Sequence, residues 1–289
     1  MIKKPNIIVA GLSKDNSKFL KLIFENLNKI ISISSETAFI FLENDSKDDT
    51  KHELEKWGKD KKNFRLIAIN DLDKVIPIRT VRLELLRNLY IEIIKKDNNL
   101  KKYDFLMVID MDDAFCYPIN QSVVLESINF ILSEIENAAI FSNQIGTYYD
   151  MWALRHKTIC DVDIWEELFD YVRENKVTDV EAFNATFKRK IFSINKDNNI
   201  FEVDSAFGGY GIYKLNYIIN NKSPYLGSKV KVLDLEPNIN ICRWSMCEHV
   251  NFHNGIQNQG GKLFINPKLI TGENINIEFP AYGYRNMIF

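Results

Sequence analysis

Residues 103–113 read YDFLMVIDMDD, and this stretch decides the fold that we predict. Its first seven residues are mostly apolar and β-forming, which predicts a strand buried on both faces. Three acids, Asp110, Asp112 and Asp113, follow the strand at once. Because open parallel sheets bind ligands at the carboxyl ends of their strands, we expect these acids at a ligand-binding edge.

The close spacing of the acids predicts a metal site. Neighbouring carboxylates repel one another, and a hard divalent cation such as Mg²⁺ or Mn²⁺ offsets that repulsion. Asp110 and Asp112 are the expected ligands, and the cation would neutralise a departing diphosphate. The alternative is that the acids are solvated in a loop and cap the next helix.

The chain before this stretch alternates between strand and helix patterns. The strand patterns lie at residues 6–11, 37–42 and 64–69, and the helix patterns at 18–31 and 80–95. Such alternation joins parallel strands by right-handed crossovers. We therefore predict an α/β fold whose first half, residues 5–115, is Rossmann-like with a mostly parallel central sheet.

The second half of the chain is less regular. It contains helix patterns at 122–135 and 161–174, a strand pattern at 137–142, and short strands and turns from 189–194 onward. No repeat or proline-rich linker separates the halves. We expect one domain over residues 1–289, in which a mixed α/β half (116–289) continues the sheet.

Composition excludes several classes of protein. Hydrophobic residues make up 46% of the 289 residues and charged residues 26%, as in ordinary globular chains. The formal net charge of -2 gives no basic field for a nucleic-acid backbone. The four cysteines are scattered and no stretch reaches membrane-spanning length, so we expect a cytoplasmic protein with reduced thiols.

Three motifs, in order, carry a resemblance to a known family. Residues 41–50 (FLENDSKDDT) resemble the E-x-x-S-x-D-x-T turn of the Cap59-like mannosyltransferases, which act in capsule assembly. Residues 77–88 (PIRTVRLELLRN) resemble the segment before their metal-binding strand, and 148–155 (YYDMWALR) are similar to their YYDxWxxR motif. The resemblance covers residues 6–255, although the Asp-Met-Asp-Asp sequence stands where the relatives vary.

This resemblance implies a GT-A fold and a metal-dependent glycosyltransferase. The implied metal is Mn²⁺ or Mg²⁺, the donor a UDP-sugar or GDP-sugar, and the acceptor a glycan of capsule or lipopolysaccharide. A retained anomeric configuration, transfer of a hexose with mannose among the candidate sugars, and peripheral membrane association through a lipid-linked acceptor are also implied. The donor sugar and the linkage do not transfer from the resemblance.

The predicted nucleotide site draws on several strand ends. Its members are Ala10, Gly11, Glu43, Arg87, Asp110 and Met111. The resemblance places the base at Ala10 and Gly11, and Glu43 could accept a hydrogen bond from a ribose hydroxyl. Arg79, Arg82 and Arg87 are spaced so that one of them, with Arg87 preferred, could bind the diphosphate, since guanidinium groups pair with phosphate oxygens. The alternatives are a loop acid for Glu43 and a solvated helix face for Arg87.

Two further stretches predict a sugar and acceptor pocket. The candidates are Tyr149, Asp150, Trp152 and Arg155 in the first stretch and Asp204, Phe207, Gly208 and Gly209 in the second. Aromatic faces and carboxylates suit carbohydrate, and glycines permit close approach of a backbone to a ligand. Asp150 and Asp204 are candidate catalytic acids. Alternatively, Tyr149 and Trp152 belong to the core and Asp150 forms a structural ion pair with Arg155, and the second stretch is only a glycine-rich turn between strands.

A late cluster, CEHVNFH at 247–253, holds two of the four histidines. His249 or His253 could complete the metal site, and Glu248 could orient the acceptor hydroxyl or act as general base. In a strand, His249 and His253 would share one face. A zinc site with Cys247 lacks a fourth ligand at standard spacing.

Two other functions stay open. A sugar nucleotidyltransferase would need a glycine-rich loop after the first strand, whereas GLSKDNSK (11–18) has one glycine. A non-catalytic carbohydrate-binding protein descended from a transferase would not need the acids. The chain has no GxGxxG fingerprint for a nicotinamide dinucleotide.

Overall fold

The computed structural model describes residues 4–235 and 237–275. An eight-stranded sheet runs through it in the order β3-β2-β1-β4-β7-β5-β10-β6. The strands are β1 (Asn6–Ser13), β2 (Glu36–Asn44), β3 (Phe64–Ile69), β4 (Phe105–Asp110), β5 (Asn137–Gly146), β6 (Phe201–Val203), β7 (Tyr210–Lys214) and β10 (Lys262–Ile275).

Pairing in the sheet confirms the predicted fold class. Strands β1 to β4 pair in parallel, as does β5 with β10. Antiparallel β7 joins β4 to β5, so the Rossmann-like half and the mixed half share one continuous sheet. The fold is therefore α/β with a mostly parallel sheet.

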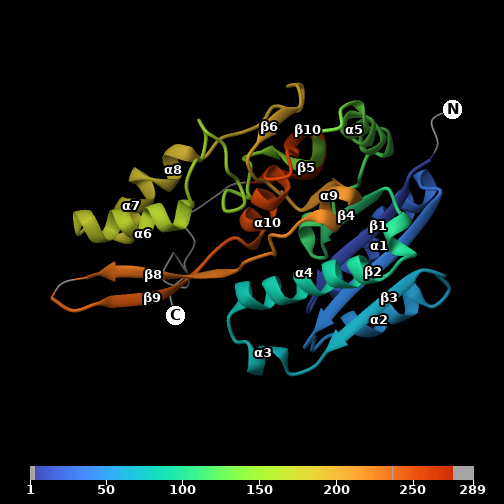
Figure 1. Ribbon diagram of the computed structural model, residues 1–289, viewed down its shortest axis with the longest axis horizontal. Coiled ribbons are helices and arrows are strands. Elements are labelled where there is room, and N and C mark those ends of the chain that lie inside the picture. Colours follow the sequence, from blue (N-terminus) through green and yellow to red (C-terminus); the bar gives the residue numbers. More distant parts are fainter. Residues whose placement is uncertain (1–3, 236, 276–289) are drawn as a thin grey trace.

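Helices cover both faces of this sheet (Figure 1). They are α1 (Ser17–Ile33), α2 (Thr50–Gly58), α3 (Leu72–Val75), α4 (Arg79–Lys96), α5 (Gln121–Ser133), α6 (Ile164–Asn175), α7 (Asp179–Ala185), α8 (Phe187–Lys190), α9 (Leu215–Asn220) and α10 (Glu248–Gln257), with 3-10 turns at Leu100–Lys102 and Asp113–Phe115. No helix in the described ranges is both long and apolar enough to cross a membrane.

The alternation of β1 divides the core into two layers. Ile7 and Val9 contact the layer that contains α1, α2 and α5, while Ile8 and Ala10 contact the layer that contains α4 and α10. This follows from the period of two along a strand. Helix α4 buries Arg87 together with its apolar residues, which is exceptional for a charged side chain.

Two local predictions in the second half are wrong. Residues 189–194, expected as a strand, instead finish α8 and continue as irregular chain, because Phe187 turns inward against Phe183. Residues 248–253 form the start of α10. Buried residues recur there at helical spacing, with His249, Phe252, His253 and Ile256 facing the core.

A separate two-stranded ribbon extends from the body. It consists of β8 (Ser228–Asp234) and β9 (Asn240–Ser245), paired antiparallel, and lies at the left of Figure 1 beside α6. Lys231 on this ribbon pairs with Glu166 of α6 at 2.7 Å. The end of β9 leads directly into α10, so the ribbon is continuous with the region described next.

Candidate active site

A pocket of about 490 Å³ lies where the strand order of the sheet reverses. From β1 the chain steps outward to β2 and β3, whereas β4 lies on the other side of β1. Such a reversal opens a crevice at the carboxyl ends of the two central strands, where open α/β sheets bind ligands. The pocket takes in many of the predicted site residues: Arg87, Asp110, Met111, Asp112, Tyr149, Asp150, Trp152, Phe207, Glu248 and His249.

Asp110 and Asp112 both lie in this pocket, at the end of β4. Burial and the neighbouring charge of Asp112 raise the pKa of Asp110 to about 7. Burial also raises the pKa of Asp112, whose side chain accepts a hydrogen bond from the Ala114 N–H at 3.0 Å. The protein therefore holds more negative charge here than its own groups stabilise, which is the electrostatic condition for binding a cation.

Arg87 is already occupied by protein carboxylates. Its Nε donates to Glu248 Oε1 at 2.8 Å and its Nη2 to Asp110 Oδ1 at 3.2 Å. Its remaining nitrogen, Nη1, lies 3.5 Å from the Tyr90 hydroxyl, and the residue is 3% exposed. Arg87 thus joins α4, β4 and α10 at the pocket wall with its guanidinium paired to protein carboxylates, which does not favour its predicted role in binding the diphosphate.

Three other cations, Lys14, Arg79 and Arg82, also line the pocket. Sequence analysis named Arg79 and Arg82 as alternatives to Arg87 and missed Lys14. Arg82 Nε pairs with Asp73 at 3.1 Å, and Lys14 pairs with the same carboxylate. Arg79 has no hydrogen bond or ion pair with any other residue that the structure describes, and its charge opposes the burial that raises the pKa of Asp112. Its place at the start of α4, where backbone N–H groups also attract anions, is the signal that could have favoured it over Arg87.

Asp150 and the glycine loop hold each other in place. Asp150 Oδ2 accepts the Gly208 N–H at 3.0 Å, and the Gly209 carbonyl accepts the Asp110 N–H at 2.9 Å. Gly208 and Gly209 have φ of 73° and 104°, and a Cβ on Gly209 would lie 2.8 Å from the Ala114 carbonyl. Neither glycine lines the pocket, so both support the acids, whereas Phe207 beside them does line it.

The residues of the YYDMWALR stretch divide between pocket and scaffold. Tyr149 and Trp152 line the pocket. Arg155 does not, because its Nη2 donates to Asp163 at 3.1 Å, and Trp152 Nε1 donates to the same carboxylate at 3.1 Å. The structural ion pair of Arg155 is therefore with Asp163 rather than with Asp150, and the substrate role predicted for Arg155 is not supported.

The two late histidines have different environments, although they lie on one face of α10. Both nitrogens of His253 have protein partners, Ser205 Oγ at 2.8 Å and the Tyr213 hydroxyl at 2.9 Å, and the ring is fully buried. Burial lowers its pKa to about 3, so the ring is neutral. His253 does not line the pocket and has no nitrogen left for a metal, which corrects that part of the prediction.

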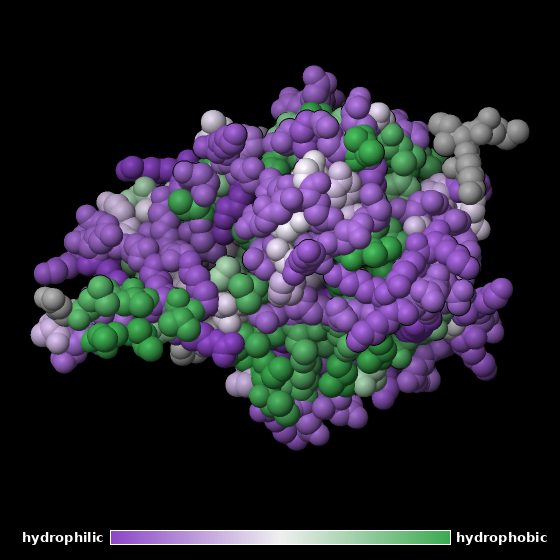
Figure 2. Space-filling view, in the orientation of Figure 1, coloured by the Kyte–Doolittle hydropathy of each residue, from purple (hydrophilic) through white to green (hydrophobic). Residues whose placement is uncertain are grey.

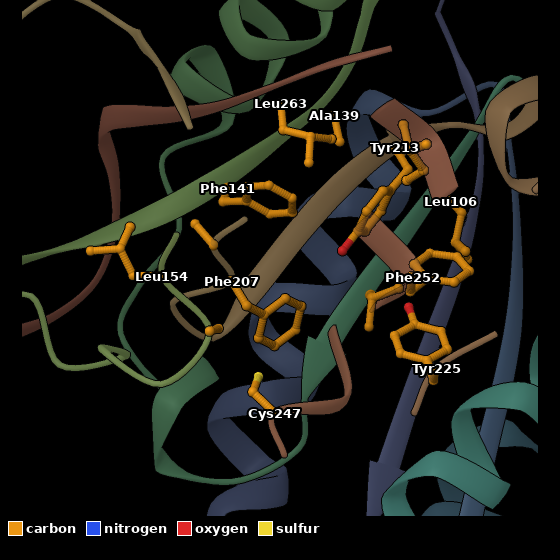
Figure 3. Close-up of a cluster of buried hydrophobic side chains, with 14 of the residues drawn as sticks. Leu106, Ala139, Phe141, Leu154, Phe207, Tyr213, Tyr225, Cys247, Phe252 and Leu263 are labelled. Atoms are coloured by element: carbon orange, nitrogen blue, oxygen red, sulfur yellow. The ribbon is translucent and has the colours of Figure 1, made fainter. Parts of the chain in front are cut away.

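His249, in contrast, lines the pocket. Its ring stacks on Phe207 with centroids 4.1 Å apart, and its buried Nδ1 has no hydrogen-bond partner among the described residues. Burial lowers its pKa well below the usual range, which leaves a neutral imidazole. Figure 3 shows Phe207 and Cys247, the residue before α10, pointing toward one another at one end of the buried cluster.

Four further predicted residues lie outside the pocket, in addition to Gly208, Gly209, Arg155 and His253. Ala10 is fully buried within the sheet, and a Cβ on Gly11 would lie 2.6 Å from Met111 Sδ. Strand β1 continues to Ser13, two residues beyond the predicted end, so Leu12 and Ser13 line the pocket instead. Ser13 Oγ is buried without a partner among the described residues.

The other two are acids that serve local structure. Glu43 Oε1 accepts the Ser46 N–H at 2.8 Å and is buried, while its neighbour Asn44 lines the pocket. Asp204 accepts a hydrogen bond from Gln257 at 3.3 Å. Glu43 thus stabilises the 41–50 turn itself, and the catalytic role predicted for Asp204 is not supported.

Comparisons with known proteins give similarity of fold. No family model matches the chain, so none supports the Cap59-like resemblance, and no curated protein matches its sequence. Among solved structures, the chain is similar to the mannosyltransferase PcManGT from Pyrobaculum calidifontis in complex with GDP-Man and Mn²⁺, with 10% identity and a TM-score of 0.49. That match covers 98% of this chain and 59% of that chain.

Two other solved structures are similar to the chain with comparably low sequence identity and TM-score. TarS from S. aureus in complex with UDP-GlcNAc has 11% identity and a TM-score of 0.48, covering 94% of this chain and 60% of that chain. Glucosyl-3-phosphoglycerate synthase from Mycobacterium tuberculosis in complex with Mn²⁺, UDP and phosphoglyceric acid has 10% identity and a TM-score of 0.42, covering 96% of this chain and 72% of that chain. The chain thus spans less than two thirds of the length of PcManGT and of the TarS chain, and the scores describe partial similarities of fold.

Proposed function

We propose that this protein is a metal-dependent glycosyltransferase that takes a sugar from a nucleotide-diphosphate donor. The observation that carries the proposal is the juxtaposition of Asp110 and Asp112 with Arg79 in one pocket at the strand-order reversal. Paired acids suit a divalent cation, and a nearby guanidinium suits the phosphate oxygens that the cation would also contact.

The residues present fit a cation that is held by two protein carboxylates together with water and substrate phosphates. Within residues 4–235 and 237–275, no group of three or more His, Cys, Asp or Glu side chains is arranged to hold a metal ion alone. Mg²⁺ typically takes one or two protein carboxylates and completes its shell with water and substrate phosphates. Asp110 and Asp112 supply the carboxylates, and the unpartnered Nδ1 of His249 is a further candidate ligand.

Other pocket residues would contact the nucleoside and the diphosphate of the donor. Ser13 and Asn44 end β1 and β2, Lys14 follows β1, and all three line the pocket, where they would meet the nucleoside. Arg79 replaces Arg87 as the residue that meets the diphosphate. When bound, Mn²⁺ or Mg²⁺ would supply charge neutralisation for the departing UDP or GDP.

Asp150 and Trp152 would contact the transferred sugar. Burial raises the pKa of Asp150, while the Gly208 and Ala153 N–H groups hold its two oxygens at 3.0 and 3.3 Å. Each carboxylate oxygen keeps a second lone pair that can accept a hydrogen bond from a sugar hydroxyl. Trp152 offers an aromatic face to sugar C–H groups. A glycan hydroxyl is the proposed acceptor, the resemblance favours a retained configuration, and the transferred sugar is a hexose, with mannose among the candidates.

A thermal-shift and turnover experiment tests this proposal. UDP or GDP with Mn²⁺ should raise the melting midpoint of the full chain, because ligands that bind the native state stabilise it. Excess chelator should abolish the shift, and a nicotinamide dinucleotide should cause none. Incubation with a panel of UDP-sugars and GDP-sugars should release the nucleoside diphosphate.

Other results would point to other functions. Release of pyrophosphate from a nucleoside triphosphate and a sugar phosphate would identify a nucleotidyltransferase instead. Binding of free glycans with no nucleotide effect would identify a carbohydrate-binding protein. An equal nucleotide shift in chelator would contradict the role of the metal.

A further inference from the structure

On the β8–β9 ribbon, charged side chains face the body of the protein and apolar side chains face solvent, the reverse of the usual arrangement. Lys231 points toward α6, where its Nζ contacts Glu166 at 2.7 Å and Asp170 at 2.9 Å. Val230 and Val232, the residues on either side of it, point away from the body and are largely exposed. Alternation normally places apolar side chains inward and charged ones outward.

The partner strand and the tip extend this apolar face. Ile241 pairs directly with Val232, and Leu235 and Ile239 lie at the tip. We call Val230, Val232, Leu235, Ile239 and Ile241 the hairpin patch; their exposed fractions run from 52% to 71%. Figure 2 shows this patch as a contiguous apolar area at the left end of the molecule. A contiguous exposed patch of this kind marks an interaction site more often than scattered residues do.

The geometry points to a lipid bilayer surface as the partner: we propose that the hairpin patch inserts into the boundary between headgroups and acyl chains. The members of the patch are aliphatic, whereas protein interfaces are enriched in aromatic and arginine anchors. Five such side chains also cover less than the ~800 Å² that each partner buries in a stable protein interface. A second copy of this chain is therefore the less suitable occupant.

The ribbon itself suits shallow insertion. Its backbone groups pair between β8 and β9, which reduces the cost of leaving water. Lys229 and Lys231 are paired with acids of α6 on the opposite face, so no unpaired cation of theirs attracts anionic headgroups. Arg243, which pairs with Val230 across the ribbon, donates from its Nε to Ser228 Oγ at 3.0 Å. Insertion should therefore depend mainly on apolar contact and only weakly on the charge of the lipid.

A second apolar area lies on the same face of the molecule. Figure 2 shows it at the bottom of the view, where α3 lies, and Val75 at the end of α3 is 76% exposed. Arg79 follows this area along the chain and Cys247 follows the ribbon, and both line the pocket. A bilayer that contacts both areas would therefore contact segments that lead along the chain into the pocket. The docking itself does not depend on the proposed function.

Sedimentation with vesicles tests the proposal on the full chain without any nucleotide or sugar. The parent should pellet with phosphatidylcholine vesicles, equally well when phosphatidylglycerol is added and at low or high salt. The double variant Val232→Ser with Ile241→Ser should have a vesicle partition coefficient at least about tenfold lower than that of the parent, because two apolar side chains are lost from the inserted face.

A matched control removes the same two residue types elsewhere. Ile135 and Val180 are 85% and 54% exposed and lie outside the hairpin patch. Ile135→Ser with Val180→Ser should pellet like the parent. Circular dichroism checks that each variant folds. If the double variant does not fold, Leu235→Ser at the tip of the ribbon is tested in its place.

Four outcomes would overturn the proposal. The first is a parent that stays in solution with both kinds of vesicle, and the second is binding that needs anionic lipid and is lost in high salt. The third is an equal loss of vesicle binding in the hairpin and control variants. The fourth is a parent that is dimeric without lipid while the hairpin variant is monomeric. The last would assign the hairpin patch to a second copy. None of these outcomes bears on nucleotide binding, so the two proposals fail separately.

Discussion

Asp112 offers the sharpest test among single residues, because a metal ligand and a structural cap respond differently to the same change. Asp112→Asn keeps size and packing but removes a charge that the cation needs. Sugar transfer should fall by about 100-fold or more, as expected when a main source of charge stabilisation is lost. The melting midpoint of the metal-free protein should stay equal or rise, since one of several repelling carboxylates is gone.

Asp60 supplies the control for Asp112. It is an exposed acid in the turn after α2, outside the pocket. Asp60→Asn should change neither transfer nor the melting midpoint. A structural Asp112 would show the reverse pattern, with about 0.5–2 kcal/mol of stability lost and transfer kept.

The two histidines of α10 should separate binding from stability. His253→Ala leaves Ser205 Oγ and the Tyr213 hydroxyl without their partner, so the free energy of unfolding should fall by about 2–4 kcal/mol. His249→Ala should instead weaken joint binding of Mn²⁺ and nucleotide by about tenfold or more, by analogy with changes around other metal sites. Urea titration and Mn²⁺ titration measure the two effects.

The histidine comparison has a clear contrary result. If His249→Ala binds Mn²⁺ and nucleotide like the parent, His249 is only a stacking partner of Phe207. If His253→Ala lowers binding while the protein is fully folded, the corrected assignment of His253 is itself in error.

At the scale of elements, Arg87 makes α4, β4 and α10 interdependent. Arg87→Met should lower the free energy of unfolding by about 3–5 kcal/mol, because Glu248 and Asp110 then lack their buried countercharge. Glu248→Gln alone leaves Arg87 with Asp110 as its remaining partner. The double variant should lose clearly less than the sum of the two single losses, since neither charge of the pair remains.

Urea unfolding of the four proteins in this cycle measures the coupling. A matched pair on the surface, Lys96 with Glu92, is exposed at the end of the same helix and should show coupling of at most about 1 kcal/mol. Additive losses for Arg87 and Glu248 would contradict the view that this pair connects α4 to α10.

At the scale of the whole molecule, stability should depend on pH through opposing groups. Asp110 has a folded pKa of about 7, well above its ordinary value, so its stabilising contribution is present below about pH 4 and is lost as pH rises to about 7. His253 acts in the opposite sense, because burial lowers its pKa to about 3 and it must stay neutral in the fold. The parent alone therefore does not isolate either group.

Comparison with Asp110→Asn isolates Asp110, because His253 is common to both proteins. In chelator, the melting midpoint of Asp110→Asn minus that of the parent should be larger at pH 8 than at pH 5. The change should reach about 2–4 °C, the shift caused by ~1 kcal/mol in a protein of this size. A difference that does not vary with pH would mean that Asp110 is not held in a pocket of excess negative charge.

Local patterns in the sequence determined the alternating strands and helices of the first half and the acids at the end of β4. Hydrophobic periodicity is a property of neighbouring residues, and the strand that ends at Asp110 could be identified from residues 103–113 alone. The placement of Asp110 and Asp112 in the pocket follows from that strand being central. These features needed no knowledge of distant contacts.

Only the tertiary structure decided which other side chains reach the pocket. Arg87 turned inward because Glu248, 161 residues away, supplies its countercharge, and His253 turned away because Ser205 and Tyr213 take both its nitrogens. Arg79 became the candidate for the diphosphate because its neighbours left it without an ion pair among the described residues. Residue type names the chemistry that a side chain can perform, whereas the partners that orient it come from parts of the chain that only folding brings together.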